Sequence, residues 1–410
     1  MTHIYLDANA TTRLADPVRQ VMLECYEQQY VNPASQHRPG QLARRQIEIA
    51  RRSIGERLGA DPGDRVIFTS GGTESNNFAI QGLLVAKAAD REAKGTEAAE
   101  GVTAVQYNGQ PSLLVSGIEH PSVLGAADHL ASRALSRKIP VDSDGVVCID
   151  QLTVLLQTPT DLVSLMLVNN ETGVIQDLPA VSKACRNHGA WLHCDAVQGV
   201  GKIPVNFRDL DVAAMTVTAH KIHGPRGIGC LILKSGVEIQ PLFFGGAQQL
   251  AQRPGTEDVA LVTGFAKAVE LVVTELPQRQ AKLSELRDLF ESTIRQAIPD
   301  VVIHGSGKTR APHTSNLSFP GSQDLPTVNR QALLMACDAA GVAISTGSAC
   351  SSGSSEPSHV LTAMGCPSEL IASSIRISFS TLNQRTEVIQ GAERIINAVR
   401  HLRRQKSHQK

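Results

Sequence analysis

Lys221 stands between a strand-like run, AAMTVTA (213–219), and a glycine-rich turn, IHGPRGIGC. Burial disfavours the charged form of a lysine, so a lysine at a strand end inside a pocket has a lowered pKa. Its neutral amine is then a nucleophile that can form a Schiff base with a carbonyl group. Taken alone, Lys221 would be interpreted as a surface residue, but the residues around it favour a reactive amine.

Asp195 and Gln198 follow the preceding strand-like run, AWLHCDA (190–196). They place a carboxylate and an amide at the end of the strand before the one that carries Lys221. The chemistry of pyridoxal 5'-phosphate (PLP) requires a carboxylate beside the ring nitrogen and a lysine for the Schiff base. Helix capping by Asp195 is the alternative interpretation. The combination of the three residues favours a PLP site.

A third loop has the form of an anion cradle. The segment SGGTESNN (70–77) follows a strand-like run and opens a helix, so backbone N–H groups around Gly72 and Thr73 can face a phosphate or a carboxylate. A plain helix cap by Thr73 or Ser75 is equally compatible with the sequence. The segment GSGKT (305–309) resembles part of a nucleotide-binding loop, but Val302 occupies the position of the glycine that the full motif needs. Nucleotide hydrolysis is therefore excluded.

Three more polar residues lie after or within strand-like runs. His120, in EHPSV, could stack on a flat ring or move a proton. Asn170, in NNETG, could hydrogen-bond a ring hydroxyl group, and Arg376, in SIRIS, could bind a substrate carboxylate with two hydrogen bonds. Structural alternatives remain open for each of them: a structural histidine, a turn asparagine and an ordinary ion pair.

Cys350 lies in the segment STGSACSSGSSE (345–356), which is made largely of glycine and serine. A loop of this composition cannot pack tightly. We therefore expect its cysteine to be exposed and mobile, as suits a nucleophile that enters and leaves a site. A passive surface thiol is the alternative.

The eight cysteines predict neither a disulfide framework nor a metal site. A chain of this length does not need disulfides to fold. Cys185, His188, His193 and Cys194 have a spacing that resembles zinc ligands. The first two end a helical pattern, however, and the last two alternate along a strand, so that their side chains point to opposite faces. We expect most of the cysteines to be reduced and buried.

The loops that carry this chemistry follow a series of short apolar runs. The runs are 66–70, 112–118, 162–168, 190–196, 213–219 and 229–233. Their alternation with amphipathic stretches predicts an α/β fold with a mostly parallel sheet, and ligands in such folds bind at the carboxyl ends of the strands. From residue 265 the pattern changes, and it predicts a helix (265–297), strands at 301–305 and 314–319, and a helix near 328–340.

We therefore predict an N-terminal segment (1–15) that packs with the small domain, a large domain (16–264), and a small α+β domain (265–410) that carries Cys350. Residues 86–111 lack apolar periodicity and are interpreted as a surface insertion.

A formal net charge of zero gives no attraction to nucleic acid or to an anionic membrane. The N-terminal residues lack the basic and apolar regions of a signal peptide, which predicts a cytoplasmic protein.

Together these motifs resemble the cysteine desulfurases of NifS/IscS type, which are fold type I PLP enzymes in the class V aminotransferase family. The resemblance implies a large domain around a mostly parallel mixed sheet and a smaller α+β domain. It covers nearly the whole chain, in the ordered segments YLDANATT, NPASQHRPG, SGGTESNN, EHPSV, VNNETGVIQD, HCDAVQ, HKIHGPRGIG, RPGTED, GSACSSGSSEPSHVL and SIRIS.

The resemblance also implies roles for single residues. Lys221 would hold PLP, His120 would stack on its ring and share the acid–base work, and Cys350 would take the sulfur of L-cysteine as a persulfide, leaving L-alanine. Arg376 and Asn170 would bind the substrate. The residues implied to bind the cofactor are Lys221, Gly72, Thr73, His120, Asn170, Asp195, Gln198, Thr218, His220 and Thr256, and Thr256 would reach the phosphate in the partner subunit of a homodimer.

Two other functions remain open from the residues alone. A PLP pocket would also serve a transaminase or a lyase that acts on other amino acids, including a C–S or selenocysteine lyase. The other is a protein that relays sulfur without catalysing a reaction. A desulfurase needs a sulfur-acceptor protein as a partner, and the sequence does not name it.

Overall fold

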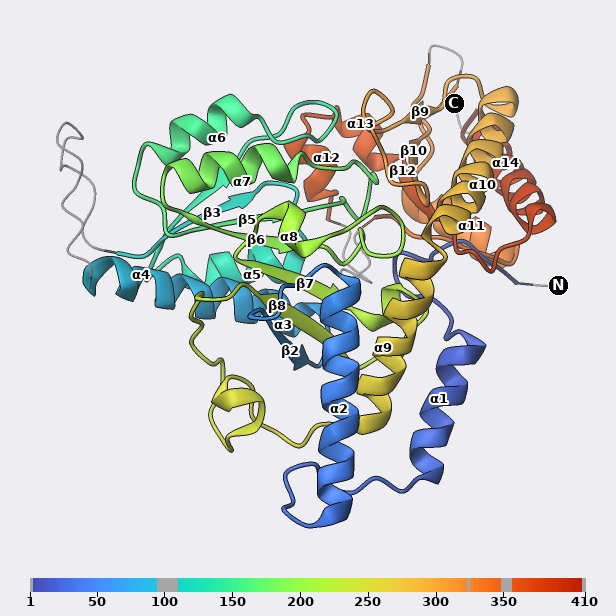
Figure 1. Cartoon of the computed structure of the whole chain (residues 1–410). Coiled ribbons are helices and arrows are strands. Elements are labelled where there is room, and N and C mark those ends of the chain that lie inside the picture. The colour runs from blue at the N-terminus through green and yellow to red at the C-terminus, as the bar shows by residue number, and fades with distance from the viewer. Residues whose placement is uncertain (1–2, 94–109, 323–324, 348–355, 408–410) are drawn as a thin grey trace.

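A seven-stranded sheet forms the centre of the structure (Figure 1). The structure is a computed structural model that describes residues 3–93, 110–322, 325–347 and 356–407. The strand order is β2-β8-β7-β6-β5-β3-β4; all pairs from β7 to β4 are parallel, and β8 is antiparallel to both neighbours. The mostly parallel mixed sheet predicted from the sequence is confirmed. The strands are β2 (Arg65–Thr69), β3 (Ser112–Ser116), β4 (Leu135–Ile139), β5 (Leu162–Met166), β6 (Trp191–Asp195), β7 (Ala214–Thr218) and β8 (Gly229–Leu233).

Helices cover both faces of this sheet, because its strands present apolar side chains on both faces. Leu113 and Leu231 belong to the core on one face, and their neighbours Leu114 and Ile232 belong to the core on the other. The first face packs against α3 (Gly72–Phe78), the π-helical turn η1 (Ala79–Leu83), α4 (Leu84–Ala93) and α5 (Pro121–Leu130). The second packs against α2 (Arg38–Arg57), α6 (Ile149–Leu156), α7 (Leu178–Asn187) and α9 (Val259–Thr274).

A separate core lies beside the large sheet, around a three-stranded antiparallel sheet in the order β12-β10-β9 (Figure 1). Ile4 and Leu6 of the N-terminal segment belong to this core, and β1 pairs with β11. Its elements are β1 (Ile4–Tyr5), α10 (Leu276–Ala297), β9 (Val302–Ile303), β10 (Thr314–Ser318), α11 (Arg330–Ala339), β11 (Val342–Ala343), β12 (Ser374–Ser378) and α14 (Arg385–Ser407). The remaining helices are α1 (Asp16–Glu27), α8 (Phe207–Leu210), α12 (His359–Ala363), α13 (Ser368–Ala372) and the short turns η2 (Ala219–Lys221) and η3 (Gln248–Ala251).

The single helix predicted over 265–297 is wrong, because the chain forms two helices that meet at Glu275. Pro277 stands in the first turn of α10, and a proline has no backbone N–H to continue the hydrogen bonds of a preceding helix. Phe265 in α9 packs into the core of the large sheet, whereas Phe290 in α10 packs into the second core. The division into domains stays a prediction, but these cores favour a boundary at Glu275 over one at residue 264.

Two further predictions differ from the structure, one at the edge strand β4 of the large sheet and one at helix α4. Strand β4 was missed because its sequence, LSRKI, carries charged residues, as edge strands commonly do. The interpretation of residues 86–111 as an irregular insertion is wrong at its beginning, since α4 continues to Ala93 with Ala86 and Ala88 buried. Residues 94–109 lie outside the described part of the chain. No helix in the described ranges has the length and apolar character needed to cross a membrane.

Arg310 and Glu291 form a shielded ion pair in the second core. Two hydrogen bonds of 2.8 and 3.0 Å join their side chains, which are 9% and 11% exposed, and Ser315 donates a third to Glu291. Arg310→Ala leaves a shielded carboxylate without its cation, so the free energy of unfolding should fall by about 3–5 kcal/mol in urea denaturation. Arg186→Ala, which breaks an exposed pair with Asp211, should cost less than about 1 kcal/mol. Equal losses would contradict the shielding of the Arg310–Glu291 pair.

Buried histidines should make the protein sensitive to acid. Burial lowers the pKa of His193 to about 4 from 6.5, so below pH 6.5 the unfolded chain binds a proton that the folded chain does not. Above pH 6.5 this histidine does not lower the free energy of unfolding. As the pH drops from 6.5 toward 4, the free energy of unfolding falls, by up to about 1.4 kcal/mol per pH unit for each such group. His193→Gln should reduce this slope between pH 6.5 and 5, measured by urea denaturation; an unchanged slope would contradict it. The other histidines with a lowered pKa include His220, His223 and His304, each about 4, and His313.

Candidate active site

A cavity of about 530 Å³ opens at the carboxyl ends of the parallel strands. Asp195 is the last residue of β6 and Thr218 the last of β7, while His120 follows β3 closely. The strand ends therefore meet at one edge of the sheet, where ligands of such sheets bind. The predicted site residues that line the cavity are Gly72, Thr73, His120, Asn170, Asp195, Gln198, Thr218, His220, Lys221 and Arg376.

Lys221 is held by hydrogen bonds on both its side chain and its main chain. It ends η2, directly after β7, and its Nζ donates to the backbone oxygens of Asn9 and Ala10, the latter at 2.8 Å. Thr12 fixes the same turn, because its backbone N–H and its hydroxyl group both donate to the carbonyl oxygen of His220. The amine thus faces the N-terminal segment at the wall of the cavity.

Lys202 binds the backbone of this turn through a hydrogen bond. The sequence did not predict this role. Its Nζ donates to the backbone oxygen of Lys221 at 3.0 Å, and the residue is only 7% exposed. Burial, with the charges of Lys221 and Arg279, lowers the pKa of Lys202 well below its ordinary value. A lysine between glycine and isoleucine in the segment GVGKIP gives no signal of such a position.

Asp195 is 5% exposed, and its two carboxylate oxygens have separate donors. The backbone N–H of Val197 donates to Oδ1 at 3.0 Å, and Asn76 Nδ2 donates to Oδ2 at 2.7 Å. Asn76 belongs to the SGGTESNN segment, from which the sequence predicted only Gly72 and Thr73 as ligands. The bond from Val197 is of the type that a capping residue makes, so the capping alternative stays open, and Asp195 forms no ion pair in the described contacts.

The turn between β2 and α3 lines the cavity with Gly71, Gly72 and Thr73. Gly71 precedes α3 with φ of 152°, a conformation that favours glycine, and no side chain caps the helix. Ser75 shares a hydrogen bond of 2.7 Å with Thr69 instead. The plain cap by Thr73 or Ser75 is thus wrong. Thr218 and His220 line the same cavity.

Glu119 and His120 follow β3, and burial shifts their pKa values in opposite directions. Glu119 is fully buried; one of its oxygens accepts from the backbone N–H of Met166 at 2.8 Å, and the other has no partner in the described part of the chain. Burial raises the pKa of the Glu119 carboxyl well above its usual range. His120 caps α5 through Nδ1, and burial lowers the pKa of its imidazole. Neither the cap nor the buried acid was found from the sequence.

Arg376 both forms an ion pair and lines the cavity. It is 1% exposed; Nη2 donates to Asp7 at 2.7 Å, and Nη1 donates to the backbone oxygens of Gly347 and Asn170. Gln198 Nε2 donates to the backbone oxygen of Asn9, and its Oε1 has no partner among the residues that the structure describes. Asp7 was not found from the sequence, although it lies within the YLDANATT segment.

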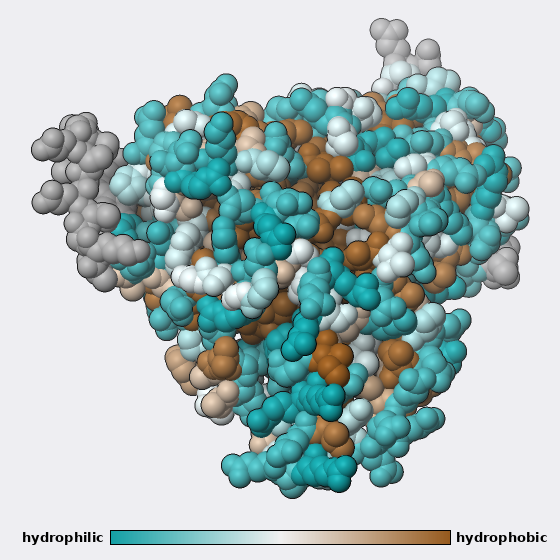
Figure 2. All heavy atoms as spheres, in the orientation of Figure 1, coloured by the Kyte–Doolittle hydropathy of each residue, from teal (hydrophilic) through white to brown (hydrophobic). Residues whose placement is uncertain are grey.

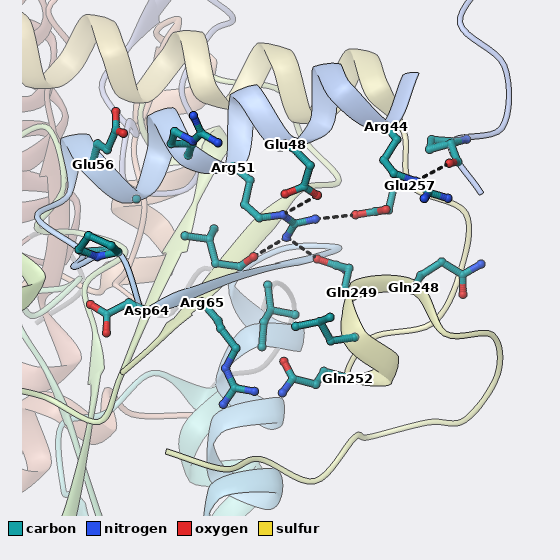
Figure 3. A pocket seen from close by; sticks show the side chains of 18 of the residues that line it. Arg44, Glu48, Arg51, Glu56, Asp64, Arg65, Gln248, Gln249, Gln252 and Glu257 are labelled. Carbon is teal, nitrogen blue, oxygen red and sulfur yellow. Dashed lines mark hydrogen bonds and ion pairs between the residues drawn. The ribbon is translucent and has the colours of Figure 1, made fainter. Parts of the chain in front are cut away.

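Thr256 is the predicted residue that the structure does not bring to the cavity. Thr256 is exposed on the segment after η3 and does not line it. Cys350 lies outside the described residues. The segment with Thr256 instead borders a second hollow, of about 1000 Å³, where Arg51 binds Glu257 and Gln249 at 3.0 Å each (Figure 3).

The cysteine and histidine residues near β6 do not gather around a metal. His193 shares hydrogen bonds of 2.9 Å with Ser164 and Thr216, one at each ring nitrogen, and Cys194 is fully buried. In the described part of the chain, no three His, Cys, Asp or Glu side chains are placed to hold a metal ion.

Comparison with known proteins identifies the family of this chain. The model of the family "Aminotransferase class-V" matches residues 4–390. "Cysteine desulfurase IscS" of Dictyoglomus turgidum is 38% identical over 97% of this chain and 95% of its own, and "Cysteine desulfurase NifS" of Azotobacter vinelandii is 34% identical over 97% and 92%. A solved structure described as a NifS-like protein superposes with a TM-score of 0.85 at 31% identity, over 98% of this chain and all of that one. The chain belongs to the aminotransferase class-V family, among its NifS/IscS-like cysteine desulfurases, and has their type I fold.

Proposed function

We propose that this protein is a PLP-dependent cysteine desulfurase that takes sulfur from L-cysteine, leaves L-alanine, and holds the sulfur as a persulfide on Cys350. The observation that carries the proposal is the cavity in which Lys221, Asp195 and His120 meet at the strand ends. The names of the relatives and the GSACSSGSSEP segment support the choice of reaction within the family.

The residues around the cavity fit PLP. Its volume of about 530 Å³ is that of a cofactor pocket, which typically measures about 300–1,000 Å³. It offers an amine at Lys221, a buried carboxylate at Asp195, and an unpartnered amide oxygen at Gln198. The N–H groups at the start of α3 suit a phosphate. When bound, PLP supplies an electron sink for the charge left at the α-carbon of an amino acid.

Each residue then has a defined task. Lys221 would hold the cofactor covalently and move the α-proton, and Asp195 would face its ring nitrogen, with Asn76 fixing the carboxylate. His120 would lie against the ring, and Gln198 and Asn170 would contact its oxygen side. The residues proposed to hold the phosphate are Gly72, Thr73, Thr218, His220 and, from the partner subunit, Thr256.

Arg376 would bind the carboxylate of the substrate. Among the described residues, three of its N–H groups donate to other groups, and Nε has no partner. Because a guanidinium group has five donors, two remain for a ligand. Asp7 would keep the guanidinium group in place while the substrate binds.

Sulfur transfer would be an attack of the Cys350 thiolate on the substrate sulfur. A sulfur–sulfur bond forms, the carbon–sulfur bond breaks, and its electron pair stays with the carbon fragment, which becomes alanine when it gains a proton. A sulfur-acceptor protein would then remove the sulfur. We expect these reactions to take place in the cytoplasm.

A homodimer would complete the site. Thr256 lies away from its own cavity, and the segment before it, around η3, exposes Phe244 at 88% and Leu250 at 78%. Figure 2 shows this region as a cluster of hydrophobic side chains on an otherwise largely hydrophilic face. Large exposed apolar side chains are typical of a surface that another protein covers.

Lys221→Ala should remove the yellow absorbance of bound PLP and prevent covalent fixation of the cofactor by borohydride. Sulfide release from L-cysteine should fall by about 10²–10⁴-fold or more, as expected for the loss of an acid–base group. Lys183→Ala, at an exposed lysine, is the control and should retain both properties. Covalent fixation to another lysine in the wild-type protein would refute the assignment.

Cys350→Ala should keep the yellow absorbance but lose sulfide release, because the pocket stays intact while the sulfur has no acceptor. Mass spectrometry should find the persulfide on Cys350 in the wild-type protein. Cys366→Ala, at a partly buried thiol, is the matched control. Retained turnover in Cys350→Ala would exclude the persulfide mechanism, and amino transfer to a keto acid without sulfide release would favour a transaminase.

A further inference from the structure

The ring of His120 is the N-terminal cap of α5. The backbone N–H of Ser122, in the first turn of this helix, donates to His120 Nδ1 at 3.1 Å. A backbone N–H can only donate, so Nδ1 must offer a lone pair to receive it. The imidazole proton of a neutral His120 is therefore on Nε2.

The hydroxyl group of Ser122 also supports a proton on Nε2 of His120. Its Oγ lies 2.7 Å from His120 Nδ1 and also accepts from Asn76 Nδ2 at 2.9 Å. The Asn76 amide nitrogen must be the donor, because its other contact, at 2.7 Å, is the carboxylate of Asp195. The single hydroxyl proton of Ser122 is then left to point at Nδ1. One continuous chain of hydrogen bonds thus joins Asp195 to His120.

The surrounding charges also act on His120. The N-terminal end of a helix disfavours a cation, and burial disfavours any charge. Lys221, Arg376 and His359 face His120 and oppose its protonation, whereas Asp195 favours it. Burial outweighs the attraction of Asp195, so that the pKa of His120 is lowered.

We propose that Ser122 is a positioning residue that holds His120 as the neutral imidazole with its proton on Nε2. This goes beyond the proposed function, but its catalytic consequence rests on that function. A neutral ring with the proton on Nε2 meets a ligand as a hydrogen-bond donor and cannot remove a proton through that nitrogen. Removal of the α-proton is then the task of Lys221, and His120 donates a hydrogen bond to the ligand while it keeps its proton.

The tautomer can be measured in the protein without PLP. In protein with 15N-labelled histidine, long-range 1H–15N correlation spectra identify the protonated nitrogen, and His120→Asn assigns the signal. We expect Nδ1 to be unprotonated and Nε2 protonated at pH 7 to 8. His37 caps α2 in the same way, through the N–H of Gly40 at 3.3 Å, and serves as an internal reference. A proton on Nδ1 of His120 at pH 7 would overturn the proposal.

Substitution of Ser122 tests the hydroxyl group separately. Ser122→Ala should lower kcat about 5-fold, the effect of one ordinary hydrogen bond, and change KM little. Ser122→Thr keeps a hydroxyl group and should restore most of the rate. Unchanged kcat in the alanine variant, or an equal loss in both variants, would refute the role of the hydroxyl group. Because the tautomer is read without turnover, a failure of this proposal is distinct from a failure of the desulfurase assignment.

Discussion

The short segment Asp7–Thr12 ties the cavity to both cores of the molecule. Asp7 pairs with Arg376 of β12, and Thr12 donates to the oxygen of His220 beside β7. Between them, the backbone oxygen of Asn9 accepts from Gln198 and Lys221, while its amide donates to Thr314 in β10. The geometry of the site thus depends on hydrogen bonds from one stretch of chain that belongs to neither sheet.

The interior around the cavity is polar, and burial disfavours the charge of several of its groups. Lys202 and His220 have lowered pKa values and Glu119 has a raised one, in each case chiefly because burial disfavours the ion. Two N–H donors bind the carboxylate oxygens of Asp195. In such a site, a few charged groups lie where a ligand binds, and the other buried polar groups are neutral and form hydrogen bonds.

The sequence predicts well what local pattern determines, and less well what depends on packing. Strands β5 to β8 and the residues at their ends could be predicted, because apolar runs and the loops after them are local signals. Asn76, Lys202 and Asp7 act across the fold, through partners far away in the sequence, and no periodicity indicates such partners. The break at Glu275 was missed although Pro277 marks it, since the apolar pattern continues across both helices.

The contact between Asp7 and Arg376 has a consequence for how the protein is made. The two residues are 369 positions apart, and β1 near the start of the chain pairs with β11 at Val342–Ala343. On the ribosome the N-terminal segment emerges first, but its partners emerge last. Such long-range contacts also form slowly. The cavity is therefore completed only near the end of synthesis, and a nascent chain cannot hold a finished site before then.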